Sequence, residues 1–179
     1  MSKIQRMVDA ATLAWTVAAT FAAPGYCSPS HPMIVSSIII KANPTLVWKT
    51  IRDPSLRKCF HRKVISSCDH KFVVEDKFDG LPIIGSATCV FNETEEPCER
   101  VEFVLVKSDK LKQFEGYWEL TPINGGRETN LQLNAFCDSG VNLPFARCIT
   151  NSTVHKFMDL ELAETKETAE SMQLKDSER

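Results

Sequence analysis

The sequence has 179 residues, of which 43% are hydrophobic and 25% are charged, and its formal net charge is -2. A chain of this length and composition buries enough apolar surface to form an ordinary globular domain. The near-neutral charge provides no basic field for a phosphate backbone, so the composition argues against nucleic acid as a partner.

The first 32 residues differ from the rest of the chain. Lys3 and Arg6 precede an uncharged apolar run, residues 10–23, which ends at Pro24-Gly25. A basic start, an apolar run of this length and small residues before a turn are typical of a secretory signal peptide. The run is shorter than the roughly 20 residues that span a bilayer. We therefore expect residues 1–32 to be a signal-like segment and linker that export the protein to the periplasm or the medium. A membrane-tethered or cytoplasmic protein is the alternative.

Seven cysteines are dispersed along the chain, and none belongs to a C-x-x-C motif. The four histidines also lack the spacing of metal ligands, so the sequence predicts neither a metal site nor a cofactor. If the protein is exported, a disulfide between Cys59 and Cys68 or between Cys137 and Cys148 stays open.

The domain begins with a strand and two short helices. Residues 33–42 are apolar and β-branched, which predicts a strand. Asn43 can cap a helix that has proline at its first position and runs to about Ile51. Asp53-Pro54 breaks this helix, and residues 55–60 are expected to form a second short helix.

Six further strands follow, because apolar and polar residues alternate with a period of two. The last two strands flank Asn124-Gly125, a pair that adopts the positive φ angles of a tight hairpin turn. With the first strand this makes seven, and the six that follow it are expected at residues 63–68, 72–78, 86–94, 101–105, 113–120 and 130–137.

Residues 145–173 contain no Gly or Pro and predict one long helix, followed by a frayed tail at residues 174–179. The domain is therefore expected to span residues 33–173. The apolar stripe of this helix is expected to contain Ala146, Ile149, Val154, Phe157 and Leu160.

Four segments of the predicted domain carry a family resemblance: IKANPTLVWKTIRD at residues 40–53, FEGYWELTP at residues 114–122, GGRETNLQL at residues 125–133 and NLPF at residues 142–145. They resemble the START-like (SRPBCC) superfamily, which includes polyketide cyclases and dehydrases, coenzyme Q-binding proteins and lipid-transport proteins. The resemblance covers about residues 34 to 165. It implies an α+β helix-grip fold, in which a curved seven-stranded antiparallel sheet wraps around the long C-terminal helix. It also implies a hydrophobic ligand cavity between that sheet and that helix.

The inward-facing positions of these elements are the predicted lining of the cavity, although the same residues could form a solid core. They are Phe72, Val74, Phe91, Val101, Phe103, Leu105, Phe114, Trp118, Leu131, Leu133, Phe145, Ile149 and Phe157. Asp76 is the carboxylate in register with Phe72 and Val74, and the alternative is that it is solvated at the rim. No catalytic motif is present, so Asp76, His61 and His155 are the only candidates for acid-base catalysis.

Three functions follow from this reading. The first is binding or transport of a hydrophobic small molecule, such as a lipid, an isoprenoid or a polyketide-like compound. The alternatives are a cyclase or dehydratase enzyme and a toxin-like protein-interaction module. The first function leaves open a transient contact with a membrane, and the sequence does not define an oligomeric state.

Overall fold

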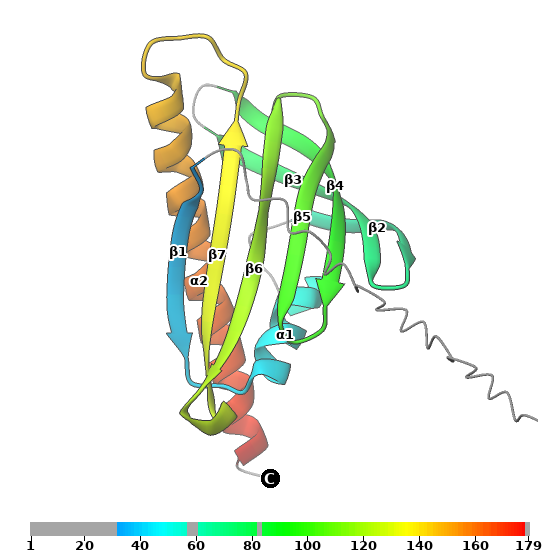
Figure 1. Cartoon of the computed structure of the whole chain (residues 1–179), viewed down its shortest axis with the longest axis vertical. Helices are drawn as coiled ribbons and strands as arrows, with labels where there is room; N and C mark the ends of the chain where they lie inside the picture. The colour runs from blue at the N-terminus through cyan, green and yellow to red at the C-terminus, as the bar shows by residue number, and fades with distance from the viewer. Residues whose placement is uncertain (1–31, 57–60, 82–83, 178–179) are drawn as a thin grey trace, which may run out of the picture.

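The computed structural model describes residues 32–56, 61–81 and 84–177. Within these ranges the chain forms one seven-stranded antiparallel sheet, one short α-helix after the first strand and one long C-terminal α-helix (Figure 1). The predicted helix-grip architecture is therefore confirmed. The strands are β1 (Ile34–Ile40), β2 (His61–Cys68), β3 (Lys71–Leu81), β4 (Gly85–Glu96), β5 (Arg100–Ser108), β6 (Gln113–Ile123) and β7 (Glu128–Asp138).

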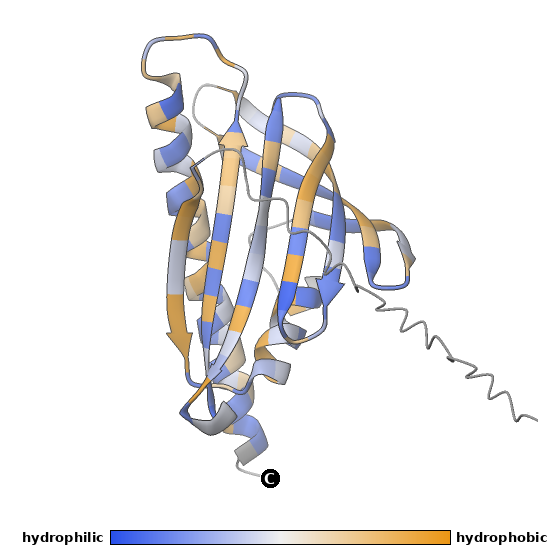
Figure 2. Ribbon diagram, in the orientation of Figure 1, coloured by the Kyte–Doolittle hydropathy of each residue, from blue (hydrophilic) through white to orange (hydrophobic). Residues whose placement is uncertain are grey.

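The strand order in the sheet is β1-β7-β6-β5-β4-β3-β2, so the first and last strands of the chain are neighbours. The sheet curves, and α2 (Ala146–Ser177) lies along one side of it, chiefly against β1 and β7 (Figure 1). Apolar and polar residues alternate along the strands (Figure 2). Successive side chains of a strand point to opposite faces, and the buried apolar ones pack in a cluster with residues of the helix.

The helix α1 (Pro44–Arg52) begins as predicted. The side-chain oxygen of Asn43 accepts a hydrogen bond from the backbone N–H of Leu46 at 2.9 Å, and Pro44 occupies the first turn. The described part of the predicted second helix is a single 3-10 turn, Pro54–Leu56, and residues 57–60 lie outside the described residues.

The hairpin of β6 and β7 has the predicted turn, because Asn124 and Gly125 adopt φ angles of 50° and 68°. Gly116 lies in the middle of β6, opposite Ala135 of β7. A Cβ atom at Gly116 would lie 2.1 Å from the backbone oxygen of Asn134 and 2.6 Å from the ring of Phe103. Only glycine therefore allows this ring to pack against the hairpin.

The C-terminal helix α2 continues to Ser177, past the predicted end at residue 173. Its most buried residues include Met158, Leu162 and Ala169. Ile149 and Leu160 are 40% and 61% exposed, so their assignment to the buried stripe was wrong. The reason is helical phase, since the buried positions recur at spacings of three, four and seven residues from Met158 and miss Leu160.

Buried side chains form two apolar clusters. One joins α1, α2 and β1 with the hairpin of β6 and β7, and the other lies on β3 and β4. Phe103 and Phe114 contact both clusters. Among the described residues, no helix combines the length and the hydrophobicity that a membrane span needs.

Candidate functional site

A cavity of about 120 Å³ lies between the sheet and α2. Most of its wall is aromatic or aliphatic, contributed by β3 to β7, by the connections beside them and by the first half of α2. The apolar lining residues are Phe78, Leu81, Ile84, Phe91, Phe103, Leu111, Phe114, Trp118, Leu133, Ala135, Val154, Phe157 and Met158.

Four phenylalanines of this wall, on four different strands, contact one another. The ring of Phe114 lies 5.8 Å from Phe78, 5.5 Å from Phe91 and 5.7 Å from Phe103, measured between centroids. The contacts of Phe91 and Phe103 with Phe114 are edge-to-face, the geometry that the aromatic quadrupole favours. This cluster therefore gives one side of the cavity a continuous aromatic surface.

Six of the predicted lining residues border this cavity: Phe91, Phe103, Phe114, Trp118, Leu133 and Phe157. Five others pack in the apolar clusters and do not border it: Phe72, Val74, Val101, Leu105 and Leu131. Phe72 instead lies beneath the guanidinium of Arg52, whose Cζ is 4.9 Å from the ring centroid.

The prediction was wrong for the remaining two residues, Phe145 and Ile149. Phe145 precedes α2 with a left-handed backbone, at φ 67°, and its side chain is 80% exposed. Ile149 lies on the exposed side of the first turns of α2, whereas Thr150 and Thr153 border the cavity. Successive residues of an α-helix are about 100° apart around the axis, so Thr150 faces the cavity while Ile149 points away from it.

One end of the cavity is charged. Arg62 on β2, Asp76 on β3 and Glu93 on β4 all border it, and their side chains are 8%, 13% and 5% exposed. Arg62 donates a hydrogen bond to Glu93 through Nη2, and its Nη1 lies 3.8 Å from Asp76 Oδ2. The expectation that Asp76 could be solvated at the rim is therefore wrong.

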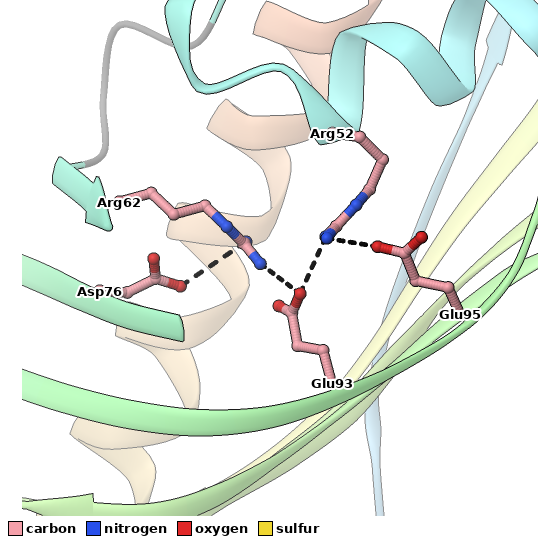
Figure 3. A network of polar contacts seen from close by, with 5 residues as sticks. All are labelled: Arg52, Arg62, Asp76, Glu93 and Glu95. Carbon is pink, nitrogen blue, oxygen red and sulfur yellow. Dashed lines mark hydrogen bonds and ion pairs between the residues drawn. The ribbon is translucent and has the colours of Figure 1, made fainter. Parts of the chain in front are cut away.

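The charged group extends away from the cavity to α1. Arg52, at the end of that helix, binds Glu93 at 2.8 Å and also forms an ion pair with Glu95 (Figure 3). We call these five residues, Arg52, Arg62, Asp76, Glu93 and Glu95, the buried charge network. It connects α1 with three strands at one end of the cavity.

Burial and pairing act in opposite directions in this network. Burial disfavours the charged form of Arg62, yet Glu93 and then Asp76 raise the pKa of its guanidinium above the usual value. Burial also raises the pKa of the Glu95 carboxyl, although Arg52 acts against this shift. Arg62 is therefore held as a cation between carboxylates.

Sequence reasoning missed Arg62, Glu93 and Glu161, which all border the cavity. The signal for Glu93 was available, because it continues the inward alternation of Ala87, Cys89 and Phe91. Glu161 lies one helical turn after Phe157 on α2, so it belongs to the same face. A polar residue at a position that the pattern places inward was therefore the sequence signal for a charged side chain in the cavity wall.

The two histidine candidates lie elsewhere. His61 is exposed at the start of β2, and His155 is exposed on α2, where its Nδ1 lies 2.9 Å from Asp159. Neither borders the cavity, so of the three predicted acid-base residues only Asp76 does. No group of three or more potential metal ligands is found within the described ranges.

The cavity also contains a cysteine, Cys137, on β7. Burial raises the pKa of this thiol to about 12. Cys137 and Cys148 are both free thiols, so the disulfide between them is not formed, and Cys59 lies outside the described residues.

No protein-family model and no curated protein sequence matches this chain. Solved structures do resemble it. The protein TTHA0849 from Thermus thermophilus matches with a TM-score of 0.68 and 15% identity, over 79% of this chain and 99% of that one. The ZhuI aromatase/cyclase from Streptomyces sp. R1128 matches with a TM-score of 0.67 and 15% identity, over 78% and 93%.

A START superfamily protein from Mycobacterium smegmatis matches with a TM-score of 0.55 and 14% identity, over 78% of this chain and 95% of that one. Each of these proteins is therefore matched over nearly its full length. The likenesses show that the chain has the START-like helix-grip fold, as its sequence motifs predicted.

Proposed function

We propose that this protein binds a small hydrophobic molecule in the cavity between the sheet and α2. The observation that carries the proposal is the cavity itself, which has a wall of phenylalanines and aliphatic side chains and, among the described residues, the charged side chains of Arg62, Asp76 and Glu93 at one end. A concave apolar site with a few convergent polar groups is the usual form of a small-molecule site. The START-like fold, shared with an aromatase/cyclase, supports the same function.

The volume of the cavity restricts the ligand. At about 120 Å³ it is smaller than the ~300–1,000 Å³ of sites that accept drug-sized molecules. A compact molecule of one or two rings, or one end of a longer chain, fits this space. A larger ligand requires α2 or the loops beside it to move outward.

The binding test uses a variant that fills the cavity. Ala135 is buried in the cavity wall, so Ala135→Leu places three more carbon atoms into the space. The matched control is Ala163→Leu, the same change on the exposed side of α2. The probe is N-phenyl-1-naphthylamine, an uncharged fluorescent molecule whose two-ring naphthyl end matches the size of the cavity, and it is titrated into each protein.

We expect saturable binding by the wild type and by Ala163→Leu, and binding at least about tenfold weaker in Ala135→Leu, which is about 1.4 kcal/mol. Circular dichroism shows whether each variant is folded. Equal binding by Ala135→Leu and wild type would place the probe outside the cavity, and no saturable binding by the wild type would overturn the proposal. Native mass spectrometry with organic extraction then identifies any molecule that copurifies.

A cyclase or dehydratase activity is the second candidate, and the position of Asp76 favours it. Its carboxylate borders the cavity and lies beside the Arg62 guanidinium, so a base and a cationic group meet at one end. In an aldol cyclisation, a base removes a proton next to a carbonyl and a cation stabilises the resulting oxyanion. A linear poly-β-ketone thioester is therefore incubated with wild type and Asp76→Asn. Ring formation that only the wild type accelerates supports this activity, and equal rates exclude it.

A further inference from the structure

The charged end of the cavity limits which polar group a ligand can bring. Among the described residues that border the cavity, Arg62 is the one positively charged side chain, and three carboxylates border it as well: Asp76, Glu93 and Glu161. Arg62 already contacts two of these carboxylates through its terminal nitrogens. Its charge is therefore committed within the protein before any ligand arrives.

A ligand carboxylate would meet an unfavourable environment here. It would have to compete with Glu93 and Asp76 for Arg62, while its own charge lay near theirs in a poorly hydrated space. Arg52, the other arginine of the buried charge network, does not neutralise a ligand carboxylate either, because it pairs with Glu93 and Glu95.

An uncharged hydroxyl group meets complementary partners at the same place. It can donate a hydrogen bond to a carboxylate and accept one from the guanidinium. The guanidinium has five N–H donors, so it can give one N–H to the ligand and keep its ion pairs. Neither interaction separates an existing pair. The charged end is thus suited to orient a neutral polar group on an otherwise apolar ligand.

We infer that the cavity selects alcohols or phenols and rejects carboxylates that have the same apolar skeleton. This inference rests on the proposed function and defines its ligand class. It separates a carrier of hydroxylated ring compounds or isoprenoid alcohols from a fatty-acid carrier, although both would use the same apolar wall.

The test compares 2-naphthol with 2-naphthoate at pH 7. The two molecules share one ring system, and only the second is negatively charged. Each displaces N-phenyl-1-naphthylamine from the wild-type protein in a fluorescence titration. We expect the dissociation constant of 2-naphthol to be lower by at least about tenfold, because a carboxylate must desolvate beside like charges.

Two variants test whether the carboxylates cause this selectivity. Asp76→Asn replaces a carboxylate beside Arg62 with an amide, and Glu161→Gln does the same on α2. Each should therefore increase the affinity for 2-naphthoate relative to that for 2-naphthol and reduce the selectivity. The matched control is Asp79→Asn, at an exposed position on the same strand as Asp76. It should leave both affinities unchanged. Because the two test residues lie on different elements, either variant suffices if the other does not fold.

The outcomes distinguish the inference from the function on which it rests. Equal or tighter binding of 2-naphthoate by the wild type would overturn the inference and leave the binding function intact. Unchanged selectivity in the folded variants would also overturn it, because the discrimination would not come from these carboxylates. If no ligand binds at all, including N-phenyl-1-naphthylamine, the proposed function fails and the inference fails with it.

Discussion

Trp118→Ala tests whether the space beside β6 is a cavity or a solid core. Trp118 lies in the middle of β6, between Val101 of β5 and Leu133 of β7, and is 8% exposed. In a solid core, Trp→Ala typically costs about 3–5 kcal/mol. One side of this ring borders the cavity, so it has fewer contacts to lose, and we expect a loss of about 2–3 kcal/mol.

The loss is measured by urea unfolding, followed by far-ultraviolet circular dichroism because the substitution removes a fluorophore. Leu162→Ala is the control, since Leu162 is 2% exposed in the same apolar cluster and does not border the cavity. It should cost about 2–5 kcal/mol and leave the affinity for N-phenyl-1-naphthylamine unchanged. Trp118→Ala should change that affinity, because it reshapes the wall.

One combination of results would refute this reasoning. If Trp118→Ala costs about 5 kcal/mol, as a fully enclosed ring does, and the wild type binds no apolar probe saturably, the space is solid core. The binding proposal would then lose its physical basis.

Three further predictions concern other parts of the molecule. Gly116→Ala should destabilise the protein by about 3 kcal/mol or more in urea unfolding, because the new Cβ overlaps backbone atoms of the neighbouring strand. The pKa of Glu95 is raised in the folded protein, because its buried site favours the protonated carboxyl. This preference stabilises the fold fully at pH values below the unfolded pKa, and the stabilisation is lost as the pH rises through the folded pKa. Glu95→Gln should therefore gain stability over wild type as the pH rises from about 4 to about 7, and a constant difference would contradict this. If the protein is exported, mass analysis from its native host should find the mature N-terminus within residues 23–28, and an intact Met1 in the soluble cytosol would reject export.

The apolar, β-branched run at residues 33–42 predicted the first strand, and the alternation of apolar and polar residues predicted the other six and the inward faces of most of them. This pattern is strong because each strand of a curved sheet has one buried and one exposed face, so a shift of one residue would reverse it. The Asn124-Gly125 turn and the Asn43 cap were equally readable, since each depends on local backbone geometry.

The boundary between cavity and core was not readable from the same pattern. Val101 and Leu131 alternate inward just as Phe103 and Leu133 do, yet only the second pair borders the cavity. Which inward residues leave a space depends on where α2 crosses the curved sheet. The position of α2 on the sheet is set by contacts between elements that are far apart in the sequence, so no local sequence pattern indicates it.

The buried charge network was missed for a related reason. Arg62 and Asp76 are opposite each other in the pairing of β2 with β3, but this register becomes known only from the three-dimensional structure. Asp76 was found because it shares a face with apolar neighbours on its own strand. Its partner lies on a short edge strand whose side chains are mostly exposed, so the alternation there carries little information.

The energetics of the two halves of the site support different roles for them. The aromatic half removes apolar surface from water and packs edge to face, so it stabilises the fold whether or not a ligand is present. The charged half contributes much less, because the desolvation of buried ions offsets most of their attraction, and apolar replacements of similar volume are often as stable. Arg100 differs from Arg62 in its position, because it lies on the outer face of the sheet, away from the cavity, where its Cζ is 3.5 Å from the centroid of the Tyr117 ring. Since stability alone gives little reason to bury Arg62 and its carboxylates, their place at the cavity wall favours a role in ligand recognition.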